Sequence, residues 1–453
     1  MKRRESMKSA REAALLILYR YDKDGAYINI AFKNLVASSD FSREDTAFIK
    51  ELVFGTVKHK ITLDYTIRKF SKIRLKKISP YILNILRMSI YQMLFMDKIP
   101  KSAAVNEGVK LAKKYGHAAS VSFTNAILRK SSELDSPLVP DGDNTEALSI
   151  SYSHPENLVQ FYIDNFGVSK AKEILKANME IAPLCVRVNR RFKTRDELID
   201  ILNEEGFSSE KTDLSKDALF ITSGGDVTKT KAYEDGLFTI QDQSSQLVAQ
   251  MLCPQPNEMV LDMCSAPGGK TTHLAELMDN KGEILAFDLY EKRLLDVNNA
   301  AQRLKIDIIK TKSHDAEVLM PELVEKADRI LLDVPCSGMG IIRRKPDIKY
   351  KEELFEFSEL VKTQKNILKV CSKYLKPGGT MIYSTCTINP AENISVIKEF
   401  LNENPDFSIS SPAECNLSEK ALDVLKDGYG TFLPGESDGF FICRLKREEK
   451  RKV

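Results

Sequence analysis

The chain has 453 residues, of which 43% are hydrophobic and 29% are charged, so it is long enough for two or three domains that each bury a core. It contains no apolar run of about 18 residues, and its N-terminal segment lacks the apolar stretch and small-residue cleavage site of a secretory signal. Composition therefore argues against a membrane protein or a secreted protein, and we expect a cytoplasmic one.

The first part of the chain, residues 1–132, is predicted to be a helical domain. Apolar residues recur there at helical spacing, and Pro80 directly after Ser79 is typical of a helix start because proline is tolerated in the first turn. The helical stretches are AREAALLILYRY, AFIKELVFGTVKHK, SPYILNILRMSIYQMLF and SAAVNEGVKLAKKYG. Residues 133–148 are rich in proline, glycine, aspartate and serine and are predicted to be a linker.

Positive charge is concentrated in this helical domain. Residues 1–130 hold 26 Lys and Arg against 11 Asp and Glu, a balance of +15, whereas the remainder holds 41 against 53. Such an excess suits a polyanionic partner such as nucleic acid. The alternative is a solubilising helical surface, and charge alone does not decide between the two.

The rest of the chain changes its pattern twice. Residues 149–235 mix short helices and strands, with a strand predicted from Leu184, and we expect a small α+β domain there. In residues 236–447 strand-like runs alternate with amphipathic helical ones, which predicts a doubly wound α/β sheet with helices on both faces. Its strand-like runs are EMVLDMC, EILAFDL, DIIKTKS, RILLDVP and TMIYSTC. Ligands of such sheets bind beyond the carboxyl ends of the strands, so residues that follow each strand are candidate site residues.

The first of these runs leads into a glycine turn. Residues 260–271 read as a strand, a tight turn and the start of a helix. Gly268 and Gly269 let the backbone approach a ligand closely, and the helix N-terminus offers free N–H groups. The spacing fits neither the GxGxxG dinucleotide motif nor the P-loop, so a dinucleotide-dependent oxidoreductase loses support.

An acidic residue ends or follows each of four successive strands: Asp262, Asp288, Asp315 and Asp333. Asp288 comes about 20 residues after the glycines, where a doubly wound site places a carboxylate for paired ribose hydroxyls. Asp315 is a candidate acceptor for an adenine amino group. The alternative for the whole set is that these residues cap helices, which aspartate favours.

Eight cysteines and five histidines are spread through the chain without a CxxC pair, so no metal site is predicted and most thiols are expected to be inert core residues. Cys336 and Cys386 differ, because each follows a predicted strand in a loop. Since the fourth and fifth strands are neighbours in the expected order, both thiols could face one substrate base. The alternative is a pair of buried core cysteines, and spacing does not decide which thiol would attack.

Three motifs in this order, DMCSAPGGKT, DVPCSGMG and YSTCT, resemble those of the RNA cytosine-C5 methyltransferases. The resemblance implies that S-adenosylmethionine is the cofactor, that Cys386 is the nucleophile and that Cys336 helps to release the product. The cofactor-binding residues that it implies are Cys264, Ser265, Ala266, Pro267, Gly268, Gly269, Lys270, Asp288, Asp315 and Asp333.

The resemblance extends over nearly the whole chain and points to the RsmB (Sun or Fmu) branch. GTVKHKITLDY, AAVNEGVKLAK and FTNAILRK resemble its NusB-like domain, and DGLFTIQDQSSQLVAQML and DGFFICRLKR also fit. This implies an all-α NusB-like domain, a small α+β domain and a Rossmann-like S-adenosylmethionine-dependent methyltransferase domain. The implied substrate is small-subunit (16S) ribosomal RNA, and no obligate protein partner is inferred. One departure is Gly435, where the resemblance predicts a histidine after Pro434.

The implied chemistry explains why these residue types are needed. C5 of cytosine is too weak a nucleophile for a methyl sulfonium, but a thiolate added at C6 makes C5 electron-rich; the C5 proton must then leave before the thiolate is expelled. Asp333 would contact N3 if it is protonated or N4 if it is not, and the sequence leaves both open. The basic run Arg343–Lys345, in the stretch that resembles the loop over the RNA strand, is expected to bind phosphates, unless it is a solvated loop.

The sequence leaves two other functions open. One is methylation of a cytosine in tRNA or elsewhere in ribosomal RNA, against which the NusB-like domain argues by resemblance alone. The other is an RNA-binding or antitermination factor with a dead methyltransferase domain, against which the intact Cys336, Cys386 and Asp333 argue.

Overall fold

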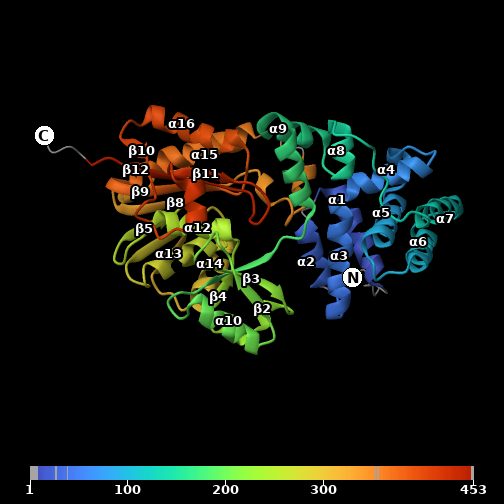
Figure 1. The fold of residues 1–453 in the computed structure, drawn as a ribbon, viewed down its shortest axis with the longest axis horizontal. Coiled ribbons are helices and arrows are strands. Elements are labelled where there is room, and N and C mark those ends of the chain that lie inside the picture. The colour runs from blue at the N-terminus through green and yellow to red at the C-terminus, as the bar shows by residue number, and fades with distance from the viewer. Residues whose placement is uncertain (1–8, 26–27, 38, 352–353, 355–356, 450–453) are drawn as a thin grey trace, which may run out of the picture. The chain divides into compact units, whose positions relative to one another are not determined.

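The computed structural model describes residues 9–25, 28–37, 39–351, 354 and 357–449. The basic residues within 1–8 therefore lie outside the described part of the chain. The chain forms two compact units, and most of their elements are labelled in Figure 1. The first unit is the chain up to Met179 together with Lys345–Lys351, and the second is the rest.

The first unit is built of helices, as the apolar spacing predicts. Several helices begin after a side chain that accepts a first-turn N–H: Ser9 before α1, Ser42 before α3 and Asn144 before α8. The helix start at Ser79 is confirmed, with Pro80 as the first residue of α5. The helices are α1 (Ala10–Asp24), α2 (Ile28–Val36), α3 (Arg43–Lys58), α4 (Lys60–Phe70), α5 (Pro80–Phe95), α6 (Lys101–Tyr115), α7 (Ala118–Ser132), α8 (Thr145–Ser151) and α9 (Glu156–Met179). Across the described ranges of the whole chain, no helix is both long and apolar enough to cross a membrane.

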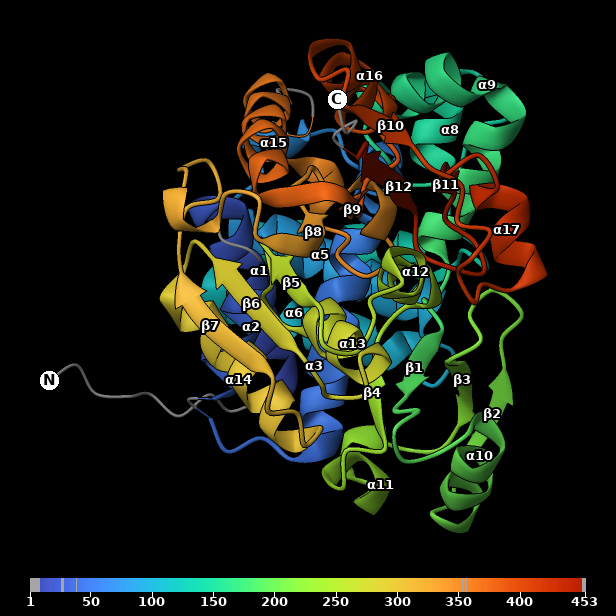
Figure 2. The same ribbon diagram turned by 90° about the vertical axis from the view of Figure 1, so that its left-hand side faces the viewer.

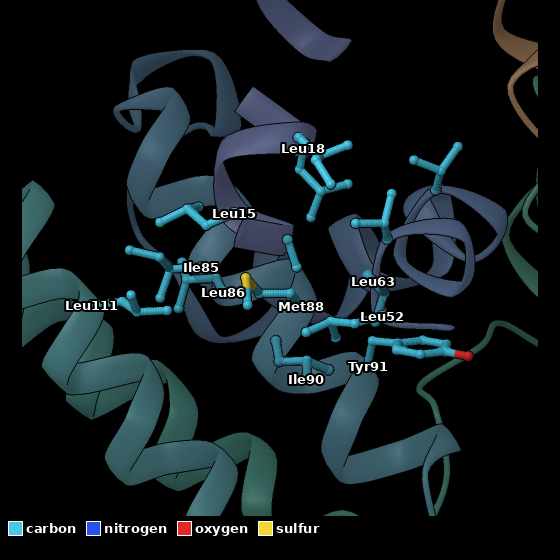
Figure 3. Close-up of a cluster of buried hydrophobic side chains, with 14 of the residues drawn as sticks. Leu15, Leu18, Leu52, Leu63, Ile85, Leu86, Met88, Ile90, Tyr91 and Leu111 are labelled. Atoms are coloured by element: carbon cyan, nitrogen blue, oxygen red, sulfur yellow. The ribbon is translucent and has the colours of Figure 1, made fainter. Parts of the chain in front are cut away.

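The core of this unit surrounds α5, in which every residue from Ile85 to Ile90 is buried. A helix that is buried all round must be covered by its neighbours. Leu15 and Leu18 of α1 and Leu52 of α3 belong to the same cluster of buried side chains (Figure 3). Truncating a leucine to alanine in such a core typically costs about 2–5 kcal/mol, so this cluster carries much of the stability of the helical unit.

The segment Lys345–Lys351 belongs to the helical unit although it follows the Cys336 motif in the chain. Lys349 Nζ donates to the carbonyl oxygen of Lys58 at the end of α3 (2.7 Å), and Tyr350 Oη donates to the carbonyl oxygen of Ser153 (3.3 Å). Burial holds the pKa of Lys349 well below its ordinary value. The sequence pattern does not reveal that this stretch packs with the helices.

We expect His59, between α3 and α4, to make the stability of the helical unit depend on pH. Its ring lies 3.9 Å from that of Phe95, and burial, reinforced by Lys349 and Lys58, lowers its pKa from 6.5 to about 3. Between these two pH values the unfolded chain binds a proton that the folded state excludes. We therefore expect His59 to leave the free energy of unfolding unchanged above pH 6.5. Between pH 6.5 and about 3 the free energy of unfolding should fall by about 1.4 kcal/mol per pH unit.

Urea unfolding of the full chain at a series of pH values measures this effect. His59→Phe keeps the aromatic packing and removes the titrating group. The variant should show a shallower loss of unfolding free energy with falling pH than the wild type, and equal slopes would contradict the assignment.

The second unit contains a small antiparallel sheet with strand order β2-β3-β1-β4. The strand expected at Leu184 is confirmed as β1, which pairs with both β3 and β4. Helix α10 begins at a capping box formed by Thr194 and Glu197, and its Leu198 packs with Val186 of β1. The elements are β1 (Leu184–Val188), α10 (Arg195–Glu204), β2 (Ser208–Lys211), β3 (Ala218–Ser223), α11 (Lys231–Glu234) and β4 (Phe238–Ile240).

The larger sheet is the doubly wound sheet that the alternating pattern predicts. Its order is β10-β12-β9-β8-β5-β6-β7, with β11 paired to β12 (Figure 2). Strands β5 to β9 pair in parallel and β12 is antiparallel to β9. The chain passes from β5 outward to β6 and β7 and then returns to β8, so the topological switch point lies between β5 and β8. The strands are β5 (Met259–Asp262), β6 (Glu283–Asp288), β7 (Ile309–Ser313), β8 (Ala327–Asp333), β9 (Leu375–Thr385), β10 (Phe407–Ile409), β11 (Tyr429–Phe432) and β12 (Phe440–Arg447).

Helices cover both faces of this sheet, because successive side chains of a strand point to opposite sides. Ile330 and Leu332 of β8 pack in the cluster that contains α15 and α16, whereas Leu331 packs in the cluster that contains α12 and α13. The helices are α12 (Gln243–Leu252), α13 (Gly269–Leu277), α14 (Glu291–Arg303), α15 (Ser358–Cys371), α16 (Ile394–Glu403) and α17 (Glu419–Leu425). With both faces covered, the carboxyl edge of the sheet is where this fold places a ligand site.

Candidate active site

Acidic residues end three neighbouring strands at one edge of the large sheet. Asp262, Asp288 and Asp333 are the last residues of β5, β6 and β8. Because these strands are parallel, their carboxyl ends meet at the same edge. Strand β9 ends one residue before Cys386, and Asp315 lies two residues beyond β7. The predicted site residues therefore follow strands that end at one edge.

The glycine turn follows β5 and opens α13. Gly268 has a φ of +99°, in the left-handed region, and its N–H donates to the carbonyl oxygen of Ser265 (2.7 Å). A Cβ at position 268 would lie 2.9 Å from Cα of Val297, so only glycine fits between this turn and α14. The first N–H groups of α13 come directly afterwards and are not capped by a side chain at Gly268.

Arg187 of β1 fixes this turn from the small sheet. It is fully buried, it donates from Nη1 to the carbonyl oxygen of Gly269 (2.6 Å), and it forms an ion pair with Glu276 of α13 (2.7 Å). Removing one partner of a buried ion pair typically costs about 3–5 kcal/mol. Arg187 is thus a supporting residue of the turn that no sequence motif indicates.

Asp288 and Asp315 both stabilise local turns. Asp288 is buried; its Oδ1 accepts from the N–H of Tyr290 (3.0 Å) and its Oδ2 from the N–H of Ala266 (3.3 Å). Asp315 is exposed, and its Oδ1 accepts from the N–H of Glu317 (2.9 Å). These backbone contacts resemble the capping alternative, and Arg293 also forms an ion pair with Asp288 (3.2 Å). Because a carboxylate has about four lone pairs, each side chain still keeps some capacity for a ligand.

Two buried polar atoms beside the glycine turn have no partner among the residues that the structure describes. Asp262 is buried, which raises its pKa to about 7; its Oδ2 accepts from Thr271 Oγ1 (2.7 Å), whereas its Oδ1 has no partner there. The buried hydroxyl of Ser265 is in the same situation. Buried polar atoms ordinarily have partners, so these two mark a place for a polar ligand.

Asp333 is held by two donors at the end of β8. Lys270 Nζ of α13 lies 2.6 Å from Oδ2, and Ser384 Oγ of β9 donates to Oδ1 (2.8 Å). The same ammonium group lies 5.0 Å from the centroid of the Phe440 ring. In this ion pair Asp333 acts as an acceptor, and its remaining lone pairs suit an amino group of a ligand.

Cys336 and Cys386 lie side by side, as expected from neighbouring strands. Their sulfur atoms are 3.2 Å apart, which is longer than a disulfide bond of about 2.05 Å. The hydrogen bond to Cys386, followed by burial, raises the pKa of the Cys336 thiol well above its ordinary value. The Cys336 thiol is therefore protonated at neutral pH, and the two sulfur atoms lie within hydrogen-bond distance of each other.

A buried carboxylate that the sequence analysis did not single out joins the two cysteine loops. Glu392 is fully buried and accepts hydrogen bonds from both loops and from α15. Its donors are Ser337 N–H (2.8 Å), Ser337 Oγ (2.5 Å), Gln364 Nε2 (3.1 Å), Thr387 Oγ1 (3.3 Å) and Asn389 Nδ2 (3.1 Å). Ser337 follows Cys336 and Thr387 follows Cys386, so one carboxylate fixes both thiols. The sequence feature that points to it is the polar stretch NPAEN, one residue after YSTCT.

The backbone joins the same loops. Gly340 N–H donates to the carbonyl oxygen of Cys386 (3.0 Å), and Gly439 N–H donates to that of Gly340 (2.8 Å). A Cβ at position 340 would lie 1.9 Å from the carbonyl oxygen of Gly439, so no other residue fits there. At Gly435, where the sequence departs from the family pattern, the carbonyl oxygen accepts from Arg343 Nη1 (2.6 Å).

The expected contact with RNA phosphates is wrong for Arg343, whereas the side chain of Arg344 is ion-paired but 31% exposed. Arg343 is buried and pairs with Asp438 (2.8 Å), and Arg344 pairs with Asp242 (3.0 Å) and also with Asp438 (2.5 Å). A guanidinium that loses water needs a carboxylate partner, and here two buried carboxylates supply it. Of this basic run, Lys345 has an exposed side chain.

Three family models match the chain in the order of the predicted domains. The NusB family matches residues 8–133, and the ferredoxin-like domain of the RsmF/B-like methyltransferases matches residues 154–228. The family described as 16S rRNA methyltransferase RsmB/F matches residues 249–446, which include all strands of the large sheet but the last residue of β12. The predicted fold class is thereby confirmed.

Known proteins resemble the chain over most of its length. It is 38% identical over 447 residues to the probable ribosomal RNA small subunit methyltransferase B of Bacillus subtilis, covering 97% of this chain and 99% of that one. It is 33% identical over 412 residues to ribosomal RNA small subunit methyltransferase B of Proteus mirabilis, covering 90% and 92%. A crystal structure of a methyltransferase homolog protein from Pyrococcus horikoshii is 30% identical, with a TM-score of 0.57 over 68% of this chain and 100% of that one. The chain therefore belongs to the RsmB family of 16S ribosomal RNA methyltransferases.

Proposed function

We propose that this chain methylates C5 of a cytosine in 16S ribosomal RNA, with Cys386 as the nucleophile. The observation that carries the proposal is the pair of thiols 3.2 Å apart at the ends of two parallel strands. Asp333 stands three residues before Cys336 and is bonded to Ser384, two residues before Cys386. A nucleophile, a second acid or base and a charged orienting group are what a covalent route to C5 requires.

S-adenosylmethionine suits the neighbouring part of this edge. The unpartnered atoms at Asp262 and Ser265, next to the open glycine turn, support a polar ligand there. When bound, the cofactor supplies an electrophilic methyl group, which the activated C5 takes by displacement. Asp288 would accept from ribose hydroxyls and Asp315 from an adenine amino group. The cofactor-binding set that we propose is Cys264, Ser265, Ala266, Pro267, Gly268, Gly269, Lys270, Asp288, Asp315 and Asp333.

Cys386 attacks C6 of the base. A bond forms between its sulfur and C6, and the electrons of the C5–C6 double bond shift so that C5 becomes nucleophilic. The high pKa of Cys336 leaves that thiol protonated, which supports Cys386 as the attacking group. Asp333, an acceptor in its ion pair with Lys270, is suited to the N4 amino group of the base rather than to N3.

Release of the product then requires two bonds to break. The proton on C5 must be removed, and its electrons restore the C5–C6 double bond as the bond from C6 to the Cys386 sulfur breaks. Once that sulfur is bonded to carbon it is only a weak thioether acceptor, so the hydrogen bond that is the main cause of the high pKa of Cys336 is weakened. Cys336, or a water that it positions, then assists removal of the C5 proton.

Methyl transfer to naked 16S RNA tests the proposal. RNA from a strain that lacks the enzyme is incubated with the protein and methyl-labelled S-adenosylmethionine, digested to nucleosides and analysed by mass spectrometry. The label is expected in 5-methylcytidine. Label in N4-methylcytidine or in a 2′-O-methyl nucleoside would overturn the assignment of C5, and stronger labelling of tRNA than of 16S RNA would overturn the substrate.

Asp288→Asn should weaken cofactor binding. The amide keeps an acceptor for only one of the two N–H groups, of Tyr290 or of Ala266, and it loses the charge. Each charge-assisted contact to a ligand hydroxyl is worth about 1.5–3 kcal/mol. We expect about 10- to 100-fold lower affinity for S-adenosylmethionine by calorimetry. Asp296→Asn, an exposed position on α14, is the matched control. Wild-type affinity in a folded Asp288→Asn variant would remove Asp288 from the cofactor site.

A further inference from the structure

The most concentrated charge of the helical unit lies where α4 passes into α5. Between Arg68 and Lys77, six of ten residues are Lys or Arg, and the printed sequence has no Asp or Glu from residue 65 to residue 96. All six side chains are exposed. They are Arg68, Lys69, Lys72, Arg74, Lys76 and Lys77. We call this stretch the basic loop.

None of these six cations takes part in an ion pair with another described residue, in contrast to several basic residues elsewhere in the helical unit. Lys60 and Arg87 pair with Asp22, and Lys114 pairs with Glu12. An unpaired cation keeps its full attraction for an external anion. Among the described residues of this unit, the basic loop is therefore the part that is best suited to a polyanion.

A hollow of about 350 Å³ adjoins the basic loop. Ile73 and Lys77 of the loop line it, together with Ile82 of α5 and with Ala119 and Phe123 of α7. Its wall is thus largely apolar and includes an aromatic ring, and the side chain of Ile73 is 44% exposed. Flat, partly apolar nucleobases bind in such hollows, whereas a duplex keeps its bases stacked and paired.

We propose that the basic loop and its hollow form a binding site for unpaired RNA, with backbone phosphates on the cations and one splayed base in the hollow. This site gives the excess positive charge of the N-terminal third a defined role in RNA binding, in place of a general role in solubility. It rests on RNA being the substrate of this family, and it does not depend on which atom of the base is methylated. Binding can therefore be tested without methyl transfer.

Fluorescence anisotropy with labelled oligouridylate measures the phosphate part of the site. The variant Lys72→Gln/Arg74→Gln/Lys76→Gln removes three cations from the loop in the full chain. Each lost phosphate contact to a single strand should lower the slope of log affinity against log salt by about 0.7, so the slope should fall by about 2 between roughly 50 and 200 mM salt. Affinity near 0.1 M salt should weaken about 10- to 100-fold.

The matched control is Lys33→Gln/Arg43→Gln/Lys50→Gln, which makes the same charge change at exposed positions of α2 and α3. It should leave the slope close to that of the wild type. If both triple variants flatten the slope equally, net charge rather than a site explains the binding, and the proposal is overturned. An unchanged slope in the loop variant overturns it as well.

Ala119→Leu tests the hollow, because leucine favours a helix and would fill the space at the start of α7. We expect weaker binding of oligouridylate with the wild-type salt slope, whereas Ala119→Ser should bind as the wild type does. Unchanged affinity in Ala119→Leu, or a preference for the oligouridylate–oligoadenylate duplex over the single strand, would refute the base-binding part. Failure of these assays would leave the methylation assay above unaffected, so the two proposals can fail separately.

Discussion

Cys386→Ser should abolish methyl transfer, and it should form no covalent complex with RNA. A serine hydroxyl is a much poorer nucleophile at neutral pH than a thiol, and loss of the nucleophile typically lowers kcat by about 10⁴-fold or more. The two sulfur atoms are 3.2 Å apart, and a serine hydroxyl at position 386 can still accept from the Cys336 S–H, so the substitution changes chiefly the nucleophile. Methyl transfer to 16S RNA, followed by denaturing electrophoresis, measures both effects.

Cys336→Ala should fail at a later step. Attack and methylation remain possible because Cys386 is retained, but removal of the C5 proton loses its assistant. Enzyme should then accumulate as a methylated RNA complex that survives denaturation. Cys253→Ser is the matched control: it removes a half-buried thiol at the end of α12 and should show wild-type turnover without a trapped complex.

The opposite result would reverse the roles of the two thiols. If Cys386→Ser forms adducts and Cys336→Ala does not, then Cys336 is the nucleophile. If neither variant forms an adduct, filter binding with the same RNA separates a binding failure from a chemical one: normal binding without adducts would contradict the covalent mechanism.

Glu392→Gln should lower kcat by about 100-fold, the scale expected when reacting groups are displaced by about 1 Å. The amide keeps the shape of the side chain but places an NH₂ group where the carboxylate accepted from several donors on two loops. At least one buried donor next to Cys336 or Cys386 is then left unsatisfied, which typically costs about 1–3 kcal/mol. Both thiols are retained in this variant, but they should no longer be held at the distance and orientation that they have in the wild type.

Glu399→Gln makes the same chemical change at an exposed position of α16, where the carboxylate pairs with Lys365, and it should have wild-type kcat. A general loss of folding would also impair the cofactor site, whereas a positioning role predicts that Glu392→Gln keeps its affinity for S-adenosylmethionine and loses the rate of adduct formation. Wild-type adduct formation in Glu392→Gln would show that Glu392 does not position the thiols.

Much of the architecture could be predicted from the sequence. The period of apolar residues distinguishes the helices before residue 130 from the strands after residue 258, because a buried face repeats about every 3.6 residues in a helix and every 2 in a strand. The residues at the carboxyl edge follow from the same reasoning, since a residue that ends a parallel strand must lie at that edge. Cys336, Cys386 and Asp333 were found in this way, and the match to known motifs gave the family.

Other features were decided only by the tertiary structure. Glu392 bonds to Ser337, 55 positions earlier in the chain, and Arg187 pairs with Glu276, 89 positions later. The charges of Arg343 and Arg344 looked available to RNA in the sequence, yet Asp438 binds both. Local patterns fix which segments are helices or strands, but a hydrogen bond or an ion pair between distant residues depends on how the segments pack and on which groups lose water together. That packing therefore decides which of the charged residues support the site and which remain free to meet RNA.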